Sequence, residues 1–247
     1  MKAAHFTIKS WLATGLTFFY PDVCQTCGLE SATAQEGYVG TRCWEKVRFI
    51  KPPFCDRCGL PFEGEIGAPF ECSNCRDMEL SFCSARAAVL VNGLVLDVIH
   101  RYKYQRALWF EVFLADLLQR QATSVLRQQQ WDMIVPVPLF PLKKREREFN
   151  QAEHLAARLS KAVGVPLEAS VLSRVEHTRT QTLLSRSERA RNVRHAFRVR
   201  QASRLSGRRV VLVDDVLTTG ATTSACAKVL KEAGAGEVCV WTVARGL

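Results

Sequence analysis

Residues 210–222 constrain the fold of this chain more than any other segment. Residues 210–213 form a continuous aliphatic run, which is typical of a strand that is buried on both faces of a parallel sheet. Two acids, Asp214 and Asp215, follow the run, and a turn rich in threonine and glycine then leads into an amphipathic helical pattern that ends near Gly234. This order predicts an α/β fold in which helices flank a parallel sheet.

The turn at residues 218–222 predicts a phosphate site, because backbone N–H groups and hydroxyls gather there at the start of a helix. Carboxylates at the carboxyl edge of a parallel sheet accept hydrogen bonds from vicinal hydroxyls such as a ribose diol. The segment resembles the phosphoribosyltransferase signature. By this resemblance, Asp214 and Asp215 are the catalytic acids and hold the ribose hydroxyls of phosphoribosyl pyrophosphate (PRPP). Its 5′-phosphate would be bound by Thr218, Thr219, Gly220, Ala221 and Thr222.

A second buried strand is expected at residues 131–135, with a helix from about Asn150 to about Val163 after it. The loop between them would meet the same edge of the sheet as the two acids, where it could contact pyrophosphate. Two prolines remove backbone donors from this loop, so that recognition would depend on cationic side chains. The predicted pyrophosphate loop consists of Val137, Pro138, Lys143, Lys144, Arg145 and Arg147.

A polar stretch from Arg174 to Gln181 precedes a short basic helix that a capping box at Ser185 and Glu188 would start. We interpret the stretch as a flexible loop that closes over the site and excludes water from a reactive sugar cation. The alternative is a plain basic helix on the surface. The candidate residues of the flexible loop are Arg174, Gln181, Arg186 and Arg189.

The positive charge of the chain is concentrated in one region. The formal net charge is +10, and residues 143–209 hold 17 Lys and Arg residues against 6 Asp and Glu residues. Such a stretch either binds phosphates, on a small molecule or on a nucleic-acid backbone, or forms a solvated basic surface.

Eight of the ten cysteines precede residue 84, which predicts a small Cys-rich module at residues 1–83 and a second domain at residues 84–247. Two Cys-x-x-Cys knuckles supply four thiolates that can enclose a structural zinc ion completely. The ligands of this first site are Cys55, Cys58, Cys72 and Cys75.

A second zinc site is incomplete in the sequence. Cys24, Cys27 and Cys43 are present, but Gly40 stands where a matching knuckle needs cysteine. The site either recruits Cys83 or His5, binds zinc weakly or stays empty. The alternative for Cys83, which we favour, is a small buried side chain that ligates nothing.

The chain is expected to be cytoplasmic. No run approaches the roughly 18 apolar residues of a membrane span, and the apolar run at residues 11–20 ends in aromatic residues and a proline rather than in a signal-peptide cleavage site. We interpret this run as an N-terminal helix of the cytosolic protein. A reducing cytosol also keeps thiols available for metal binding.

Together the motifs closely resemble the ComF family of competence-associated phosphoribosyltransferase-like proteins. The resemblance runs from about residue 19 to about residue 245 and rests on the Cys-x-x-Cys knuckles, Tyr102-Lys103-Tyr104, PVPL at 136–139, Phe149-Asn150-Gln151, the spaced polar residues of 174–197 and VDDVLTTGAT at 213–222. It implies a zinc ribbon, a type I phosphoribosyltransferase fold and a role in handling single-stranded DNA during natural transformation. Two residues depart from the family pattern: Gly40 replaces a cysteine, and Glu148 replaces a glycine.

Two functions remain open at this stage. One is a PRPP-dependent pentosyltransferase that uses Mg²⁺, although no acceptor motif or general base is evident. The other is a non-catalytic module that keeps a relic PRPP pocket and binds single-stranded DNA or proteins of DNA uptake. In that second case, bases would stack on Phe149, Tyr102, Tyr104 and Trp109.

Overall fold

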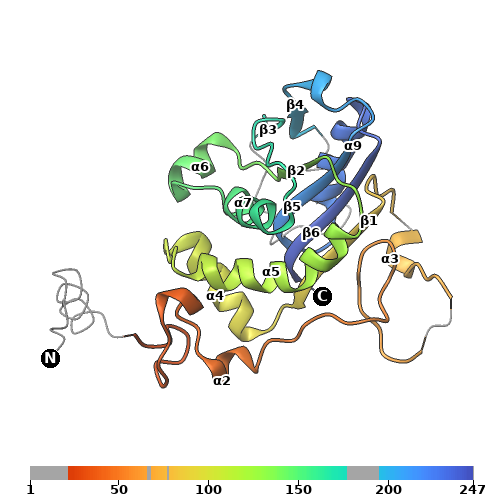
Figure 1. Ribbon diagram of the computed structural model, residues 1–247. Helices are drawn as coiled ribbons and strands as arrows, with labels where there is room; N and C mark the ends of the chain where they lie inside the picture. Colours follow the sequence, from red (N-terminus) through yellow and green to blue (C-terminus); the bar gives the residue numbers. More distant parts are fainter. Residues whose placement is uncertain (1–21, 66–67, 77, 177–194, 247) are drawn as a thin grey trace, which may run out of the picture.

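The structure is a computed structural model that describes residues 22–65, 68–76, 78–176 and 195–246 (Figure 1). A four-stranded parallel sheet with the strand order β1-β6-β5-β2 forms its centre. Its strands are β1 (Ser84–Leu90), β2 (Met133–Pro136), β5 (Arg209–Leu217) and β6 (Glu237–Arg245). A separate antiparallel pair consists of β3 (Leu172–Arg174) and β4 (Phe197–Val199).

Helices connect the parallel strands, as crossover connections require. The longer helices are α4 (Gly93–Tyr104), α5 (Phe110–Arg127), α7 (Gln151–Val163) and α9 (Ala221–Glu232). The shorter helical segments are η1 (Ala34–Glu36), α2 (Thr41–Trp44), α3 (Ser73–Arg76), α6 (Pro141–Arg147) and η3 (Ala202–Arg204).

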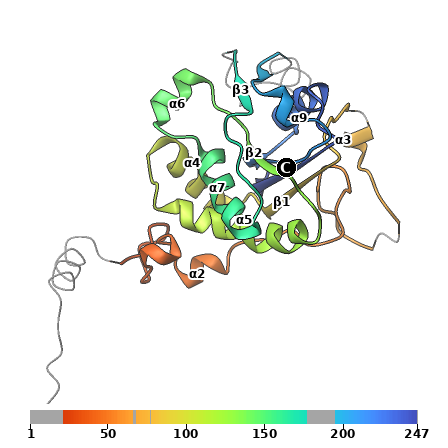
Figure 2. The ribbon, with the colours of Figure 1, turned by 45° about the horizontal axis from the view of Figure 1, so that its top comes forward.

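Helices cover both faces of the sheet (Figures 1 and 2). Because successive side chains of a strand point to opposite faces, β5 divides its aliphatic residues between two cores. Val211 and Val213 pack with α4, α5 and α7 on one face, whereas Val210 and Leu212 pack with α9 on the other. The expected α/β fold with a parallel sheet flanked by helices is therefore confirmed.

Strand β5 is longer than the sequence predicted. We expected it to end at Val213, but it continues to Leu217 and pairs with β6 along that extension, with Asp214 opposite Thr242. The two acids therefore lie within a hydrogen-bonded strand instead of following it. The long aliphatic strand β6 supplies a partner beyond the point where the apolar run of β5 stops.

The predicted helix after the PVPL segment is α7, and its start is fixed by Asn150. The Asn150 side chain accepts a hydrogen bond from the backbone N–H of Ala152 and donates one to the carbonyl of Val137 at 3.1 Å. This side chain therefore caps α7 and ties it to the loop that follows β2.

The Cys-rich segment contributes to both hydrophobic cores. Cys24 and Cys43 belong to the core that includes α5, whereas Cys55 and Cys58 belong to the core that includes α9. The backbone N–H of Ala85 in β1 donates to the carbonyl of Arg57 at 2.7 Å, which joins the Cys55–Cys58 knuckle to the edge of the sheet. A boundary at residues 83 and 84 stays a prediction.

The expected helix at residues 11–20 lies outside the described residues. Within the part of the chain that the structure describes, no helix has the length and apolar character needed to cross a membrane.

Glu148 adopts a left-handed backbone conformation, with φ of 68°, at the end of α6. Its side chain forms an exposed ion pair with Arg106 at 2.8 Å, which contributes little to stability. Because glycine adopts this conformation without strain, we expect Glu148→Gly to raise the free energy of unfolding by about 1 kcal/mol in urea denaturation.

The matched control for that substitution is Glu146→Gly, which places glycine inside the same helix. It should lower the free energy of unfolding by up to about 1 kcal/mol. Equal destabilisation by both substitutions would show that the backbone at Glu148 is not strained.

Candidate functional site

A cavity of about 490 Å³ opens at the carboxyl edge of the sheet, where β2 and β5 end and α9 begins. It gathers residues from segments that lie far apart in the sequence. Of the predicted site residues, its lining includes Val137, Pro138, Lys143, Arg147, Arg174, Asp214, Asp215, Thr218, Thr219, Gly220, Ala221 and Thr222.

The two acids differ in their surroundings. The carboxylate of Asp215 lies 2.7 Å from Nζ of Lys103, whereas Oδ1 of Asp214 accepts a hydrogen bond from the backbone N–H of Asp215 at 2.9 Å. Desolvation by burial, followed by repulsion from Asp215, raises the pKa of Asp214 from 3.8 to about 7. Lys103 and Arg174 oppose that rise in pKa.

This pKa shift gives a pH dependence that can be measured without ligand. Between about pH 4 and pH 7 the folded protein holds the Asp214 proton while the unfolded chain releases it, so that rising pH favours unfolding. We expect the stability of Asp214→Asn, relative to the wild type, to increase with pH across this window and to level off above it. Urea denaturation at a series of pH values tests this expectation.

Asp132→Asn is the control with the opposite sign. The backbone N–H of Arg209 lowers the pKa of Asp132, so that its ionised form stabilises the fold. That stabilisation is lost as the pH falls through the folded pKa. A flat difference between Asp214→Asn and the wild type would contradict the raised pKa of Asp214.

The threonine- and glycine-rich turn forms the beginning of α9, as predicted. Gly220 precedes the helix with φ of 78°, which favours glycine, and the hydroxyl of Thr219 accepts a hydrogen bond from the backbone N–H of Ala221. The hydroxyl of Thr223 donates to the carbonyl of Gly220 at 3.1 Å. The turn thus presents the amino end of a three-turn helix to the cavity, which favours an anion.

The predicted pyrophosphate loop divides between two cavities. Residues 141–147 form the helix α6 instead of an extended loop, and its side chains therefore point in different directions. Lys143 and Arg147 line the cavity with the two acids. Lys144 and Arg145 line a neighbouring cavity of about 630 Å³, where Lys144 forms an ion pair with Glu153 at 3.2 Å.

The candidate residues of the flexible loop are only partly described. Arg174 lies in β3, lines both cavities and has its guanidinium 5.3 Å from the centre of the Phe197 ring. Gln181, Arg186 and Arg189, like the expected capping box, lie outside the described residues.

Lys103 is a site residue that our sequence analysis did not select. It lies near the end of α4, and its ammonium group neutralises Asp215 within the cavity. The signal was the Tyr102-Lys103-Tyr104 motif, in which Tyr102 is fully buried and the neighbouring lysine points toward the acids.

The four aromatic residues expected to stack with bases do not form one surface. Tyr102 and Phe149 are buried and pack against each other with ring centres 5.1 Å apart, so that the prediction is wrong for this pair. Tyr104 and Trp109 are exposed, and Arg147 lies over the Tyr104 ring at 4.8 Å. Tyr102 and Tyr104 are two positions apart in α4, and side chains at this spacing point to nearly opposite sides of a helix.

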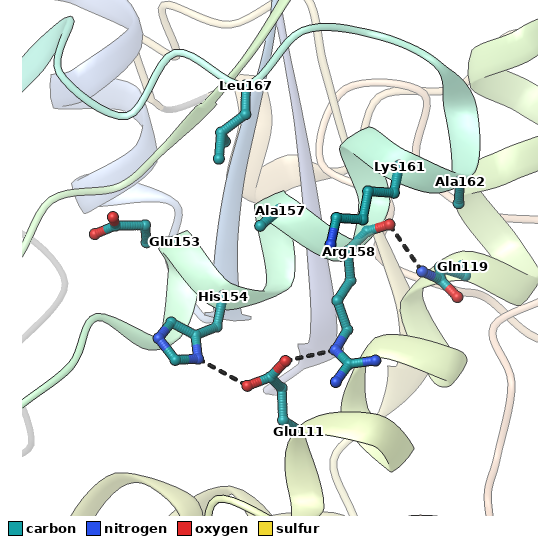
Figure 3. Close-up of a pocket in the computed structure, with 9 residues that line it drawn as sticks. All are labelled: Glu111, Gln119, Glu153, His154, Ala157, Arg158, Lys161, Ala162 and Leu167. Carbon is teal, nitrogen blue, oxygen red and sulfur yellow. Dashed lines mark hydrogen bonds and ion pairs between the residues drawn. The ribbon is translucent and has the colours of Figure 1, made fainter. Parts of the chain in front are cut away.

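A separate cavity of about 640 Å³ lies over α5 and α7 (Figure 3). There Nδ1 of His154 lies 2.7 Å from a carboxylate oxygen of Glu111, and Arg158 contacts the other oxygen of the same carboxylate. Desolvation would raise the pKa of Glu111, but its bonds to Arg158 and His154 lower it below the ordinary value. His154 does not line the cavity of the two acids, and it therefore supplies no general base there.

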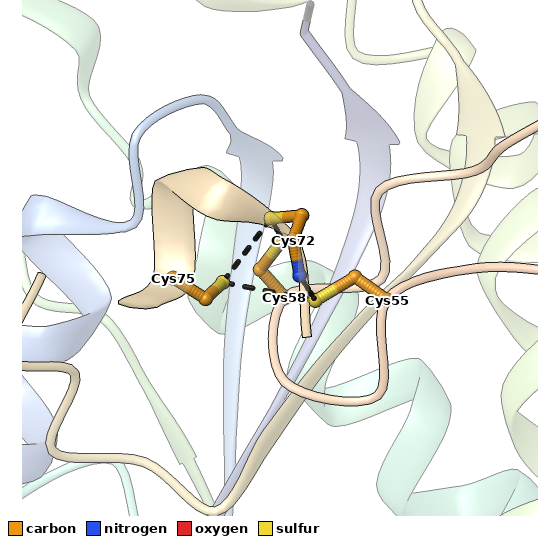
Figure 4. Close-up of side chains that lie close together, drawn as sticks. All are labelled: Cys55, Cys58, Cys72 and Cys75. Atoms are coloured by element: carbon orange, nitrogen blue, oxygen red, sulfur yellow. Dashed lines mark hydrogen bonds between the residues drawn. The ribbon is translucent and has the colours of Figure 1, made fainter. Parts of the chain in front are cut away.

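Cys55, Cys58, Cys72 and Cys75 form a buried cluster, as predicted (Figure 4). Their sulfurs lie 3.6 to 3.7 Å apart along three pairs. A tetrahedron with Zn–S bonds of about 2.3 Å has edges of about 3.8 Å, so that the cluster fits a zinc ion with no open position. The backbone N–H of Cys72 and the guanidinium of Arg245 donate to cluster sulfurs, which orients the thiolates.

Cys24, Cys27 and Cys43 also lie together, and the carboxylate of Glu30 completes the group. Cys83 is half-buried beside Ser84 and belongs to neither cluster of the described residues, which agrees with its interpretation as a packing residue. His5 lies outside the described residues.

Two protein families match this chain, one in its Cys-rich part and one in its α/β part. A double zinc ribbon domain model matches residues 15–79, and a phosphoribosyl transferase domain model matches residues 150–247.

Three curated relatives match most of the chain. Competence protein F of Haemophilus influenzae is 33% identical over 78% of this chain and 85% of its own length. DNA utilization protein YhgH of Salmonella typhi is 30% identical over 92% of this chain and 98% of its own length. Competence protein ComFC of Streptococcus pneumoniae is 29% identical over 77% of this chain and 87% of its own length. With its double zinc ribbon and its phosphoribosyltransferase fold, the chain belongs to the ComF family.

Proposed function

We propose that the chain binds PRPP together with Mg²⁺ in the cavity at the carboxyl edge of the sheet. One observation carries this proposal: a single cavity is lined by both acids, by the whole turn at residues 218–222 and by the cations Lys143 and Arg147 of α6. A phosphate, a sugar diol and a pyrophosphate need these three kinds of group.

Each part of the cavity has a proposed role. Asp214 and Asp215 accept hydrogen bonds from the ribose hydroxyls, and the amino end of α9 binds the 5′-phosphate. Lys143, Arg147 and Arg174 face the pyrophosphate. Mg²⁺ supplies charge neutralisation at the pyrophosphate when it is bound.

The reaction that this site supports is displacement of pyrophosphate at C1 of the ribose by an acceptor nucleophile. The bond to pyrophosphate breaks as the bond to the acceptor forms, and the site contributes mainly by positioning and by neutralising charge. No described side chain in the cavity is assigned as a general base.

We place this activity in natural competence, in DNA uptake and in the handling of single-stranded DNA. The names of the relatives, competence protein and DNA utilization protein, support this setting. The cytoplasm is the proposed location, because two clusters of free thiols suit a reducing compartment. Proteins of DNA uptake are the proposed partners.

Calorimetric titration of the full chain with PRPP in the presence of Mg²⁺ tests the proposal. We expect one site per chain with micromolar affinity and weaker binding of ribose 5-phosphate, which lacks the pyrophosphate. Release of pyrophosphate on addition of an acceptor would identify a transferase. Absence of any PRPP binding would overturn the proposed function.

The second candidate function is binding of single-stranded nucleic acid without catalysis. The neighbouring cavity of about 630 Å³ favours it, because Lys144, Arg145 and Arg200 line that cavity beside the proposed PRPP site. Binding of a labelled oligonucleotide should then weaken steeply as the salt concentration rises. An affinity that stays flat between low and moderate salt would remove the basis for this candidate.

A further inference from the structure

We propose that Glu30 is the fourth ligand of the second zinc site, in the place of the cysteine that the chain lacks at Gly40. The site would then hold zinc with three thiolates, from Cys24, Cys27 and Cys43, and one carboxylate oxygen. This inference does not depend on PRPP binding.

The spacing of the donor atoms fits such a site. Sγ of Cys24 lies 3.7 Å from Sγ of Cys43, and Sγ of Cys27 lies 3.7 Å from Oε1 of Glu30. All four donor atoms lie within 4.8 Å of one another. Zn–S bonds of about 2.3 Å and Zn–O bonds of about 2.1 Å place tetrahedral ligands about 3.6 to 3.8 Å apart.

Gly40 and the side chain of Glu30 occupy complementary space. A Cβ atom at Gly40 would lie 2.3 Å from Cδ and 2.4 Å from Cγ of Glu30, which is closer than atoms can approach. The backbone of Gly40 has φ of −78° and ψ of 170°, an extended conformation that any residue adopts. Glycine is therefore required here by the Glu30 side chain and not by the backbone.

Backbone groups hold the Glu30 carboxylate in place. Its Oε2 accepts a hydrogen bond from the N–H of Arg42 at 3.0 Å, and its Oε1 accepts one from the N–H of Cys43 at 3.3 Å. The N–H of Gly40 donates to Sγ of Cys24 at 3.2 Å. Such outer contacts orient metal ligands and favour their ionised forms.

The ligand set predicts unequal affinities in the two ribbons. Zinc binds soft thiolate ligands more tightly than hard carboxylate ligands. The cluster of four cysteines should therefore retain its ion longer than the cluster with Glu30. During titration with a chelator, the ion at the second zinc site, which Glu30 would help to bind, should therefore leave before the ion of the four-cysteine site.

Zinc content and chelator competition on the full chain test the role of Glu30. We expect two zinc ions per chain in the wild type and one in Glu30→Ala. Glu30→Gln keeps one oxygen that can accept from an N–H group of α2 but lacks the charge and the second acceptor, and it should weaken zinc binding at this site at least tenfold. Glu45→Ala removes an exposed glutamate from the same segment and should keep both ions.

A rescue variant separates ligation from a role in folding alone. Glu30→Ala combined with Gly40→Cys should recover the second ion as a four-cysteine site. After exchange with Co²⁺, its thiolate-to-metal charge-transfer absorbance should exceed that of the wild type, because eight thiolates replace seven. Two tightly bound ions in Glu30→Ala, or a wild-type chain whose single ion survives Cys24→Ser, would overturn the proposal.

Discussion

Replacement of both Asp214 and Asp215 by asparagine is expected to abolish measurable PRPP binding in the presence of Mg²⁺. Hydrogen bonds to a charged group contribute about 1.5 to 3 kcal/mol each, so that above the pKa of Asp214 the loss of two charges costs at least about 3 kcal/mol. That loss corresponds to more than a hundredfold in the dissociation constant. Isothermal titration calorimetry of the wild type and the double variant measures this difference.

The matched control replaces two acids outside the cavity. Asp97→Asn with Asp116→Asn changes the net charge equally but removes only exposed ion pairs within α4 and α5. This control should bind PRPP as the wild type does. If the variant of Asp214 and Asp215 melts normally and binds PRPP with unchanged affinity, the ligand site lies elsewhere.

Loss of the four-cysteine zinc site is expected to have the largest effect on stability. Cys75→Ser should release one zinc ion and lower the melting temperature by at least about 10 °C, since a loss of about 4 kcal/mol shifts a domain of this size by that amount. The cluster is part of the core beneath α9, so that its loss unpacks the sheet as well as the ribbon. Differential scanning calorimetry with a zinc assay tests this expectation.

The four-cysteine cluster is also linked to the turn at residues 218–222. Phe82 and Leu80 follow the Cys72–Cys75 knuckle and lie 3.5 to 3.7 Å from the position that a Cβ of Gly220 would take. The N–H of Ser81 donates to the hydroxyl of Ser224 in α9 at 3.0 Å. Cys75→Ser should therefore weaken PRPP binding too, whereas the control Cys83→Ser should retain both zinc and affinity. Unchanged melting of a zinc-depleted Cys75→Ser chain would refute a structural role for this ion.

The core of the candidate site could be predicted because its determinants are local in the sequence. Asp214, Asp215 and the turn at residues 218–222 lie within one strand, turn and helix, whose periodicity and turn chemistry identify them. The four cysteines of the first zinc site could be predicted for the same reason, because the spacing of the ligands is visible in the sequence.

Contacts between distant segments could not be predicted in this way. Lys103 reaches Asp215 only because α4 packs beside the sheet, and the residues near Asp215 in the sequence do not indicate that a lysine contacts it. Lys144 and Arg145 turn away from the acids because residues 141–147 are helical, which spreads a basic run around an axis. Glu30 was missed because its role depends on empty space at Gly40 rather than on a ligand motif.

The position of β6 has a consequence for how this molecule acquires its structure during synthesis. β6 lies between β1 and β5, although β1 leaves the ribosome about 150 residues earlier. Among the described strands β1 pairs only with β6, so that a nascent fragment that stops before residue 237 leaves β1 with only its bridge to Phe49. β2 and β5 can pair before β6 is made, but β1 and the Cys55–Cys58 knuckle that is bonded to it join the sheet only when the carboxyl-terminal strand is inserted.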